Sequence, residues 1–199
     1  MRNRLLLACL AAVAVTLSAC GINSIPTAEE AAKAKWADVQ SQYQRRADLI
    51  PNLVNSVRGF ADQERDVLTR VTEARANATR VTVRPDQLTD PEAMRRFTEA
   101  QGQLSQAIIP LQRLQEAYPE LRSQENFMAL QSQLEGTENR ISVSRRDYNE
   151  AVQAYNTEIR TFPGVIGARV IYGSQPMQPF QAEEAAQRAP TVDFGNRSR

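Results

Sequence analysis

Apolar side chains recur in alternating steps of three and four residues along most of this chain. The first series runs from about Ala28 to about Thr79 and contains only two charged positions, Arg46 and Glu64. Such spacing brings one side chain per turn onto a single helical face, as in helices that pack in bundles. A capping-box pattern, Thr27 followed by Glu30, predicts the start of this helix. The members of the series are Trp36, Val39, Tyr43, Arg46, Ile50, Leu53, Val57, Phe60, Glu64, Val67, Val71, Ala74 and Ala78.

Pro51 lies inside this first series. A proline in a helix interior removes a backbone N–H and crowds the preceding turn. We therefore predict a helix kinked at Pro51; a complete break there, which would give two helices, is the alternative.

A second series predicts a helix that begins at Thr89-Asp90-Pro91, because proline suits the first helical turn. Pro119 ends this helix, and Pro110 is expected to bend it. The members of the series are Met94, Phe97, Gln101, Leu104, Ile108, Leu111, Leu114 and Tyr118.

A third series predicts a helix from about Ser123 or Gln124 to Phe162, where Pro163 and Gly164 stop it. Its members are Phe127, Leu130, Leu134, Thr137, Ile141, Ser144, Tyr148, Ala151, Tyr155, Ile159 and Phe162. A short helix over Ala182 to Arg188 and a frayed polar end complete the expected elements.

The chain shows no sustained period-two alternation, so the predicted fold is all-α: an antiparallel up-and-down bundle of three long helices plus the short C-terminal helix. At 1.5 Å per residue the first helix would be about 75 Å long, against about 40 and 60 Å for the others. Its first half must therefore overhang, fold back at Pro51 or be covered by the tail, and we favour a kinked helix partly covered by the tail. We assign 27–165 to the bundle and 166–199 to a C-terminal extension.

The N-terminal segment has the pattern of a secretory signal. Arg2 and Arg4 precede an apolar run of about 15 residues, which is shorter than the roughly 20 that a spanning helix needs. Leu17-Ser18-Ala19-Cys20 then matches the bacterial lipobox, in which cleavage precedes the cysteine and lipid such as palmitate is attached there. We predict a signal peptide over 1–19, cleavage between Ala19 and Cys20, lipidation of Cys20 and a tether over 20–26. An uncleaved anchor is the alternative, and both place the chain outside the cytoplasm at a membrane.

Composition excludes several classes of chemistry. The chain has no histidine, and of its two cysteines Cys9 leaves with the signal while Cys20 carries lipid. Imidazole and thiolate supply most transition-metal sites and nucleophile–base pairs, so we expect no metal site, no cofactor and no catalytic triad. Loss of Arg2 and Arg4 changes the net charge from +1 to −1, and a near-neutral domain predicts no nucleic-acid partner.

Several ordered motifs resemble the LemA family of bacterial envelope proteins. The first is Gln42-Tyr43-Gln44-Arg45-Arg46-Ala47-Asp48-Leu49-Ile50-Pro51-Asn52-Leu53-Val54. Others are Val57 to Phe60, Val71 to Arg75, Tyr118 to Leu121, Glu125 to Phe127, Glu135 to Ile141, Tyr148-Asn149, Tyr155-Asn156 and Phe162-Pro163. The resemblance implies a membrane-attached helical bundle without an established enzymatic activity. Many members keep a spanning segment where this chain has a lipobox, and Pro110 also departs from the pattern.

The polar residues near Pro51 are the candidate partner or ligand patch: Arg45, Arg46, Asp48, Asn52, Glu138, Asn139 and Arg140. They could dock a partner or an anion, or, with Asn55, line a polar groove. A structural role is the favoured interpretation, because Arg46 lies on the apolar face and a buried arginine requires a carboxylate such as Glu138 or Glu125.

Two further patterns have structural and functional interpretations. Tyr148-Asn149 and Tyr155-Asn156 repeat at seven residues on one helical stripe, which favours core packing over recognition. Gly59, Gly102 and Gly136 lie within predicted helices, and we expect them to permit close helix approach rather than ligand binding.

The functional prediction is a lipid-anchored, non-enzymatic scaffold that binds an envelope protein. Gly21 follows the lipidated cysteine, which favours the outer membrane, facing the periplasm, in a cell with two membranes. The alternative is a carboxylate-dependent hydrolase, for example on glycans, using Glu64, Glu125, Glu135 or Glu138. Trp36, the only tryptophan, is expected in the core rather than at a sugar site.

Overall fold

A computed structural model of the chain describes residues 23–59 and 64–181. Within these residues the regular elements are helices and there is no strand, which confirms the all-α prediction. The long helices are α2 (Ser24–Arg58), α3 (Arg65–Arg80), α4 (Pro91–Ala117) and α5 (Glu125–Glu158). Short 3₁₀ turns, η1 (Pro85–Gln87) and η2 (Pro119–Ser123), connect α3 to α4 and α4 to α5. A single turn, α6 (Gly164–Gly167), and a π-helical turn, η3 (Ala168–Tyr172), follow α5.

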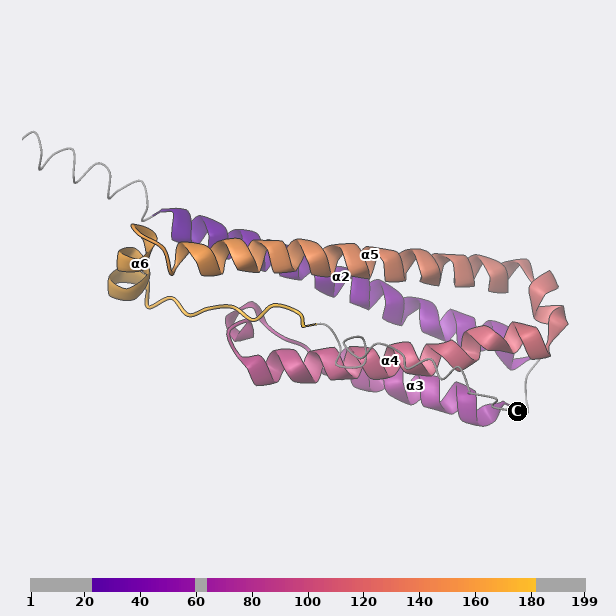
Figure 1. Cartoon of the computed structure of the whole chain (residues 1–199). Coiled ribbons are helices and arrows are strands. Elements are labelled where there is room, and N and C mark those ends of the chain that lie inside the picture. The colour runs from indigo at the N-terminus through magenta and orange to yellow at the C-terminus, as the bar shows by residue number, and fades with distance from the viewer. Residues whose placement is uncertain (1–22, 60–63, 182–199) are drawn as a thin grey trace, which may run out of the picture.

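The chain direction reverses at each step from α2 to α5, so the long helices form an up-and-down bundle (Figure 1). α2 packs mainly against α5, and α3 packs mainly against α4. Residues 173–181 return from α6 along the bundle as an extended segment (Figure 1).

The alternative of a complete break at Pro51 is wrong, because α2 continues through this residue and the chain reverses after Arg58 instead. α2 ends at Arg58, with Gly59 as its C-cap residue, and α3 begins at Arg65. The expected first helix is therefore two helices, and the described part of the bundle contains four long helices rather than three. The reversal lets α3 bury Leu68, Val71 and Ala78, which a straight continuation would have carried past the ends of its neighbours.

Pro51 also helps to join α2 to α3. It has no N–H for the carbonyl of Ala47, one turn earlier, and Arg75 of α3 donates to that oxygen instead, with Nε 2.6 Å from Ala47 O. The proline therefore leaves on α2 an acceptor that α3 uses when it folds back.

A double-mutant cycle tests this coupling. Arg75→Ala should lower the free energy of unfolding by about 1.5–3 kcal/mol, the usual range for a hydrogen bond to a charged group. In a Pro51→Ala background residue 51 regains its N–H, Ala47 O has a partner within α2, and the same substitution should cost about 1 kcal/mol less. Urea unfolding of the four proteins measures this coupling, and additive effects would contradict it.

The observed ends of the other helices agree in part with the ends predicted from the sequence. α4 begins at Pro91, within the predicted start Thr89-Asp90-Pro91, and ends at Ala117 before Pro119, both as predicted. Asp90 caps it, accepting from Glu92 N at 2.9 Å. The Thr27 cap is wrong: α2 begins at Ser24, and Thr27 donates from within the first turn to Asn23 O at 2.9 Å. The helix extends upstream because Ile25 is fully buried in the core.

The expected close approach at the glycines is also wrong for Gly59 and Gly136. A Cβ added at either position would meet no atom within 4 Å. Gly59 instead ends α2, and Gly102 borders the groove described below.

Candidate functional site

A polar layer divides the bundle core into two apolar halves. One half contains Ile25 to Tyr43 of α2 and Ile141 to Tyr155 of α5, and the other contains Ile50 to Val57 of α2 and Phe127 and Leu134 of α5. Arg46, Gln101, Ser105 and Glu138 lie between the halves, and we call these four residues the polar layer.

Arg46 is the centre of the polar layer and is 1% exposed. Its Nη1 donates to Ser105 Oγ at 2.8 Å and to Glu138 Oε1 at 3.0 Å. Its Nη2 donates to Gln101 Oε1 at 2.7 Å and to Gln101 O at 3.1 Å. Gln101 in turn donates to Ala78 O at 3.1 Å, so the layer joins all four long helices of the described chain.

This geometry confirms that Arg46 pairs with a carboxylate, and the partner is Glu138 rather than Glu125. Side chains that must meet across three helices fix how far each helix can slide, so the layer sets the register of the bundle. Because Arg46 is enclosed, it does not present its charge to a partner.

The rest of the predicted patch lies on the surface of α2 and α5. Arg45, Asp48 and Asn52 are exposed on α2, where Asp48 accepts from Gln44 at 2.8 Å. Asn139 and Arg140 are exposed on α5. The structure therefore brings Arg46 and Glu138 together, and a docking role for the exposed members stays a prediction.

The Tyr-Asn repeat of α5 holds the backbone of the extended tail. Asn149 Nδ2 donates to Phe180 O at 3.1 Å, and its Oδ1 accepts from Phe180 N at 2.8 Å. Asn156 makes the same two bonds with Met177, both at 2.9 Å. We call Asn149 and Asn156 the asparagine clamps.

The tyrosines of the repeat also bind the backbone of the tail. The Tyr148 hydroxyl donates to Gln178 O at 3.0 Å, and the Tyr155 hydroxyl donates to Gln175 O at 3.2 Å.

The clamped tail completes an aromatic core. As predicted, the tail partly covers the first helix, and it does so at Trp36. Phe180 stacks on Trp36 with ring centroids 5.8 Å apart and also contacts Tyr148 at 5.6 Å. Trp36 is fully buried, packs edge-on against Phe97 at 5.2 Å and donates its Nε1 to Val83 O at 2.9 Å. Trp36 is therefore a core residue, as predicted.

Burial of the Tyr148 phenol predicts a loss of stability in alkali. Burial raises the pKa of Tyr148 well above the value of about 10 for an exposed tyrosine, and it raises the pKa of Tyr155 in the same direction. The unfolded chain ionises first, so the contribution is fully present below pH ~10 and falls as the pH rises beyond it. Urea unfolding at a series of pH values should show this decline, and Tyr148→Phe should make it shallower. An identical alkaline slope in the variant would contradict the assignment.

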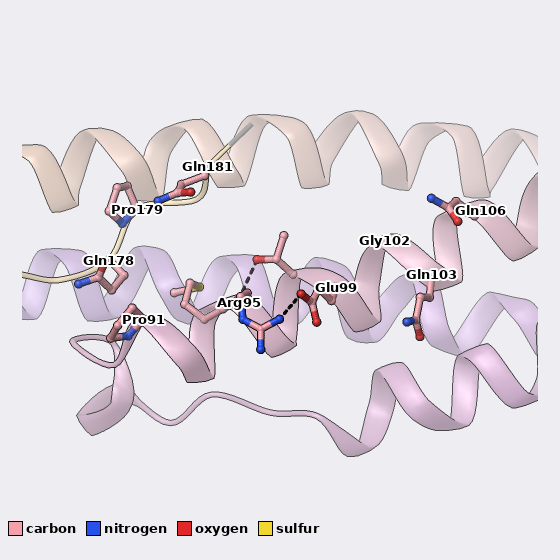
Figure 2. A pocket seen from close by; sticks show the side chains of 11 residues that line it. Pro91, Arg95, Glu99, Gly102, Gln103, Gln106, Gln178, Pro179 and Gln181 are labelled. Carbon is pink, nitrogen blue, oxygen red and sulfur yellow. Dashed lines mark hydrogen bonds and ion pairs between the residues drawn. The ribbon is translucent and has the colours of Figure 1, made fainter. Parts of the chain in front are cut away.

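A groove runs between α4 and the tail, beside the clamped segment. It encloses about 570 Å³ and is lined on the α4 side by Pro91, Met94, Arg95, Thr98, Glu99, Gly102, Gln103 and Gln106. Gln178, Pro179 and Gln181 form the tail side (Figure 2). We call this the α4–tail groove; its volume is in the range of sites that accept small ligands or short segments.

The charges of this groove are balanced within α4. Arg95 donates to Glu92 Oε1 at 2.6 Å and also bonds Glu99 (Figure 2). The same pairing raises the pKa of Arg95 and lowers that of Glu92. Glutamine amides supply most of the other polar groups of the lining. Gln103 Oε1 accepts from Asn77 at 3.2 Å and Gln178 Nε2 donates to Thr89 O at 3.5 Å, which leaves the other end of each amide for a ligand. The groove therefore suits a neutral, hydrogen-bonding ligand better than a phosphate or a metal ion.

The sequence-based hypotheses did not include the groove. A usable signal was present in Gln175-Pro176-Met177 and Gln178-Pro179-Phe180, a period-three repeat of the kind that favours an extended polyproline-II segment. Its pairing with the seven-residue Tyr-Asn repeat could have located the tail on α5.

The carboxylates of the hydrolase alternative are dispersed. Glu138 is engaged by Arg46, Glu125 and Glu135 are exposed on α5, and Glu64 precedes α3. Among residues 23–59 and 64–181, His, Cys, Asp and Glu form no group of three or more that could hold a metal. No helix in this part of the chain has the length and apolarity to cross a membrane. Ala19, Cys20 and the Ala182 to Arg188 helix lie outside the described residues.

The fold and its polar layer define a class of protein, an all-helical bundle whose first and last long helices pack against each other and are joined to the other two through a buried arginine. Sequence comparison identifies the family: the LemA family model matches residues 35–194, so the chain belongs to the LemA family. Two curated relatives are the magnetosome proteins MamQ 1 and MamQ 2 of Paramagnetospirillum magneticum (strain ATCC 700264 / AMB-1). Each is 26% identical over 157 residues, an alignment that covers 71% of this chain and 58% of the relative's length.

Proposed function

We propose that this protein is a lipid-anchored scaffold of the cell envelope that binds an extended segment of an envelope protein in the α4–tail groove. The observation that carries the proposal is the lining of the groove, which combines the amides of Gln103, Gln106, Gln178 and Gln181 with the apolar side chain of Met94. Amide side chains match the alternating donors and acceptors of an extended backbone, and apolar side chains accept those of the bound segment.

The molecule already binds one extended segment in this way. The asparagine clamps hold the backbone of Met177 and Phe180 with two hydrogen bonds each. A partner segment in the groove would lie beside that strap, with glutamines in place of the asparagines.

The proposed attachment rests on the lipobox at Leu17-Ser18-Ala19-Cys20 and is supported by membership in the LemA family. In a two-membrane cell, Gly21 favours the outer membrane, with the bundle in the periplasm. Mass spectrometry of the purified chain should find an acylated N-terminal Cys20, and Cys20→Ser should release the bundle from membranes. A membrane-bound chain that retains residues 1–19 would favour the uncleaved anchor.

Photocrosslinking in living cells tests the scaffold role. A benzophenone amino acid at Gln106, in the groove, should give a reproducible adduct with one envelope protein, identified by mass spectrometry. The matched control is Gln133, an exposed glutamine of α5 that does not line the groove. Equal labelling at both positions, or adducts only with residues 182–199 of the same chain, would contradict partner binding in the groove.

A further inference from the structure

The turn after α5 exposes large apolar side chains at one end of the bundle. Phe162 is 80% exposed, Val170 79%, Ile171 58%, Ile166 56% and Tyr172 42%. We call these five residues the apolar tip; they lie in and beside α6 and η3, at the end of the molecule where α2 begins (Figure 1).

The burial pattern of this segment is the reverse of that of an ordinary core helix. Its small residues Gly164, Gly167 and Ala168 are buried, whereas its large apolar residues face outward. A Cβ on Gly164 would collide with the backbone carbonyl of Glu158 at the end of α5, so the segment is seated closely. Ser174 N also bonds Ala168 O at 2.9 Å, which closes the turn. The apolar side chains are thus held in an outward orientation by a packed backbone.

The apolar tip lies beside the N-terminal end of α2, which follows the proposed lipid anchor in the sequence. α2 starts at Ser24, whose hydroxyl donates to the Glu158 carboxylate at 2.5 Å, and α2 also contacts α6. Cys20 is four residues before Ser24. Four residues span at most about 14 Å, so lipid on Cys20 brings the membrane surface to this end of the bundle.

The charge around the tip suits an anionic membrane. Arg160 and Arg169 are exposed within this segment, and residues 159–174 contain no Asp or Glu. Glu29 and Asp86 line a pocket together with Tyr172, but their charges are paired with Lys33 and Arg84. The nearest acid in sequence, Glu158, accepts from Ser24. Apolar side chains flanked by arginines are the combination that inserts among phospholipid headgroups.

We infer that the apolar tip docks into the headgroup region of the membrane that anchors the N-terminus, as a second contact that orients the bundle on the lipid surface. This inference rests on the membrane attachment proposed above. It requires an anionic phospholipid surface rather than a protein partner, and a second copy of the chain covering the same patch is the competing outcome of the test.

The experiment uses the full chain, purified in detergent and reconstituted into phosphatidylethanolamine–phosphatidylglycerol vesicles whose acyl chains carry bromine. The only native tryptophan, Trp36, is fully buried and gives a constant background. A second tryptophan replaces Val170 in the tip or, as a matched control, Val143, an exposed valine of α5. Side chains at the headgroup boundary lie about 5–10 Å into the interface, so the V170W signal should fall about twofold and V143W should change little.

Flotation of the same vesicles separates the possible failures. If the protein floats and V170W is quenched no more than V143W, the tip inference is wrong and the anchor stands. If the protein does not float, the proposed attachment fails, and the tip inference fails with it. A third outcome is that the V170W fluorescence changes by the same amount in vesicles whose lipids carry no bromine and that the chains crosslink as dimers. In that case a second copy of the chain covers the tip, and the inference is overturned.

Discussion

Arg46→Ala is expected to lower the free energy of unfolding by about 3 kcal/mol, one of the two largest effects predicted for this protein. The substitution removes the donor of Gln101 Oε1 in the buried polar layer and one donor each of Gln101 O and the Ser105 hydroxyl. It also opens a cavity, since Arg46 is 1% exposed. The charge left behind adds less, because the Glu138 side chain is 41% exposed and reaches water.

Arg45→Ala is the matched control. It removes the same side chain one position away, where it is exposed, and should change stability by less than about 0.5 kcal/mol. Arg46→Met, which refills much of the space, should cost less than Arg46→Ala. Urea unfolding measures all three, and equal stability of the Arg45 and Arg46 alanine variants would refute the structural role of the layer.

Replacing both asparagine clamps with alanine is expected to release the tail from α5. Each clamp makes two hydrogen bonds with the tail backbone, and loss of one should cost about 1–3 kcal/mol. A change of 1.4 kcal/mol is tenfold in an opening equilibrium, so hydrogen exchange at the amides of Met177 and Phe180 should accelerate by about tenfold or more per clamp. Acrylamide should also begin to quench Trp36, because Phe180 covers it.

Asn139→Ala provides the control on the same helix, where the asparagine is exposed and, among the described residues, has no hydrogen bond to the tail segment 173–181. Asn156→Asp is the sharper variant, since it keeps the size and the acceptor but turns the donor that faces Met177 O into a second acceptor. Unchanged exchange at Met177 in Asn156→Asp would show that apolar packing alone retains the tail.

The two largest effects concern features that the sequence revealed to different degrees. Arg46 on an apolar face is visible in the sequence, and the cost of an unpaired buried charge made a carboxylate partner a sound prediction. The choice of Glu138 over Glu125 required the relative translation of α2 and α5. The clamps were visible as a repeat, but their ligand, the tail, is more than twenty residues away.

The spacing of the two clamps along α5 is close to the spacing of the tail residues that they hold. Seven residues of helix advance about 10.5 Å, and three residues of an extended polyproline-like segment advance about 9 Å. Asn149 and Asn156 therefore face Phe180 and Met177, residues three apart on a segment that runs antiparallel to α5.

The all-helical class, the helix start at Thr89-Asp90-Pro91, the burial of Trp36 and the need of Arg46 for a carboxylate were predictable from the sequence, because each follows from local patterning or from a local desolvation cost. The turn back after Arg58 is evident only in the folded molecule. The three-four spacing of apolar residues shows which face of a helix is buried. The spacing is the same for one long helix and for two antiparallel helices joined by a turn, so it does not distinguish them. The reversal, the pairing of Arg75 with Ala47 O, the α4–tail groove and the apolar tip all depend on contacts between residues distant in the chain, which local patterning does not encode.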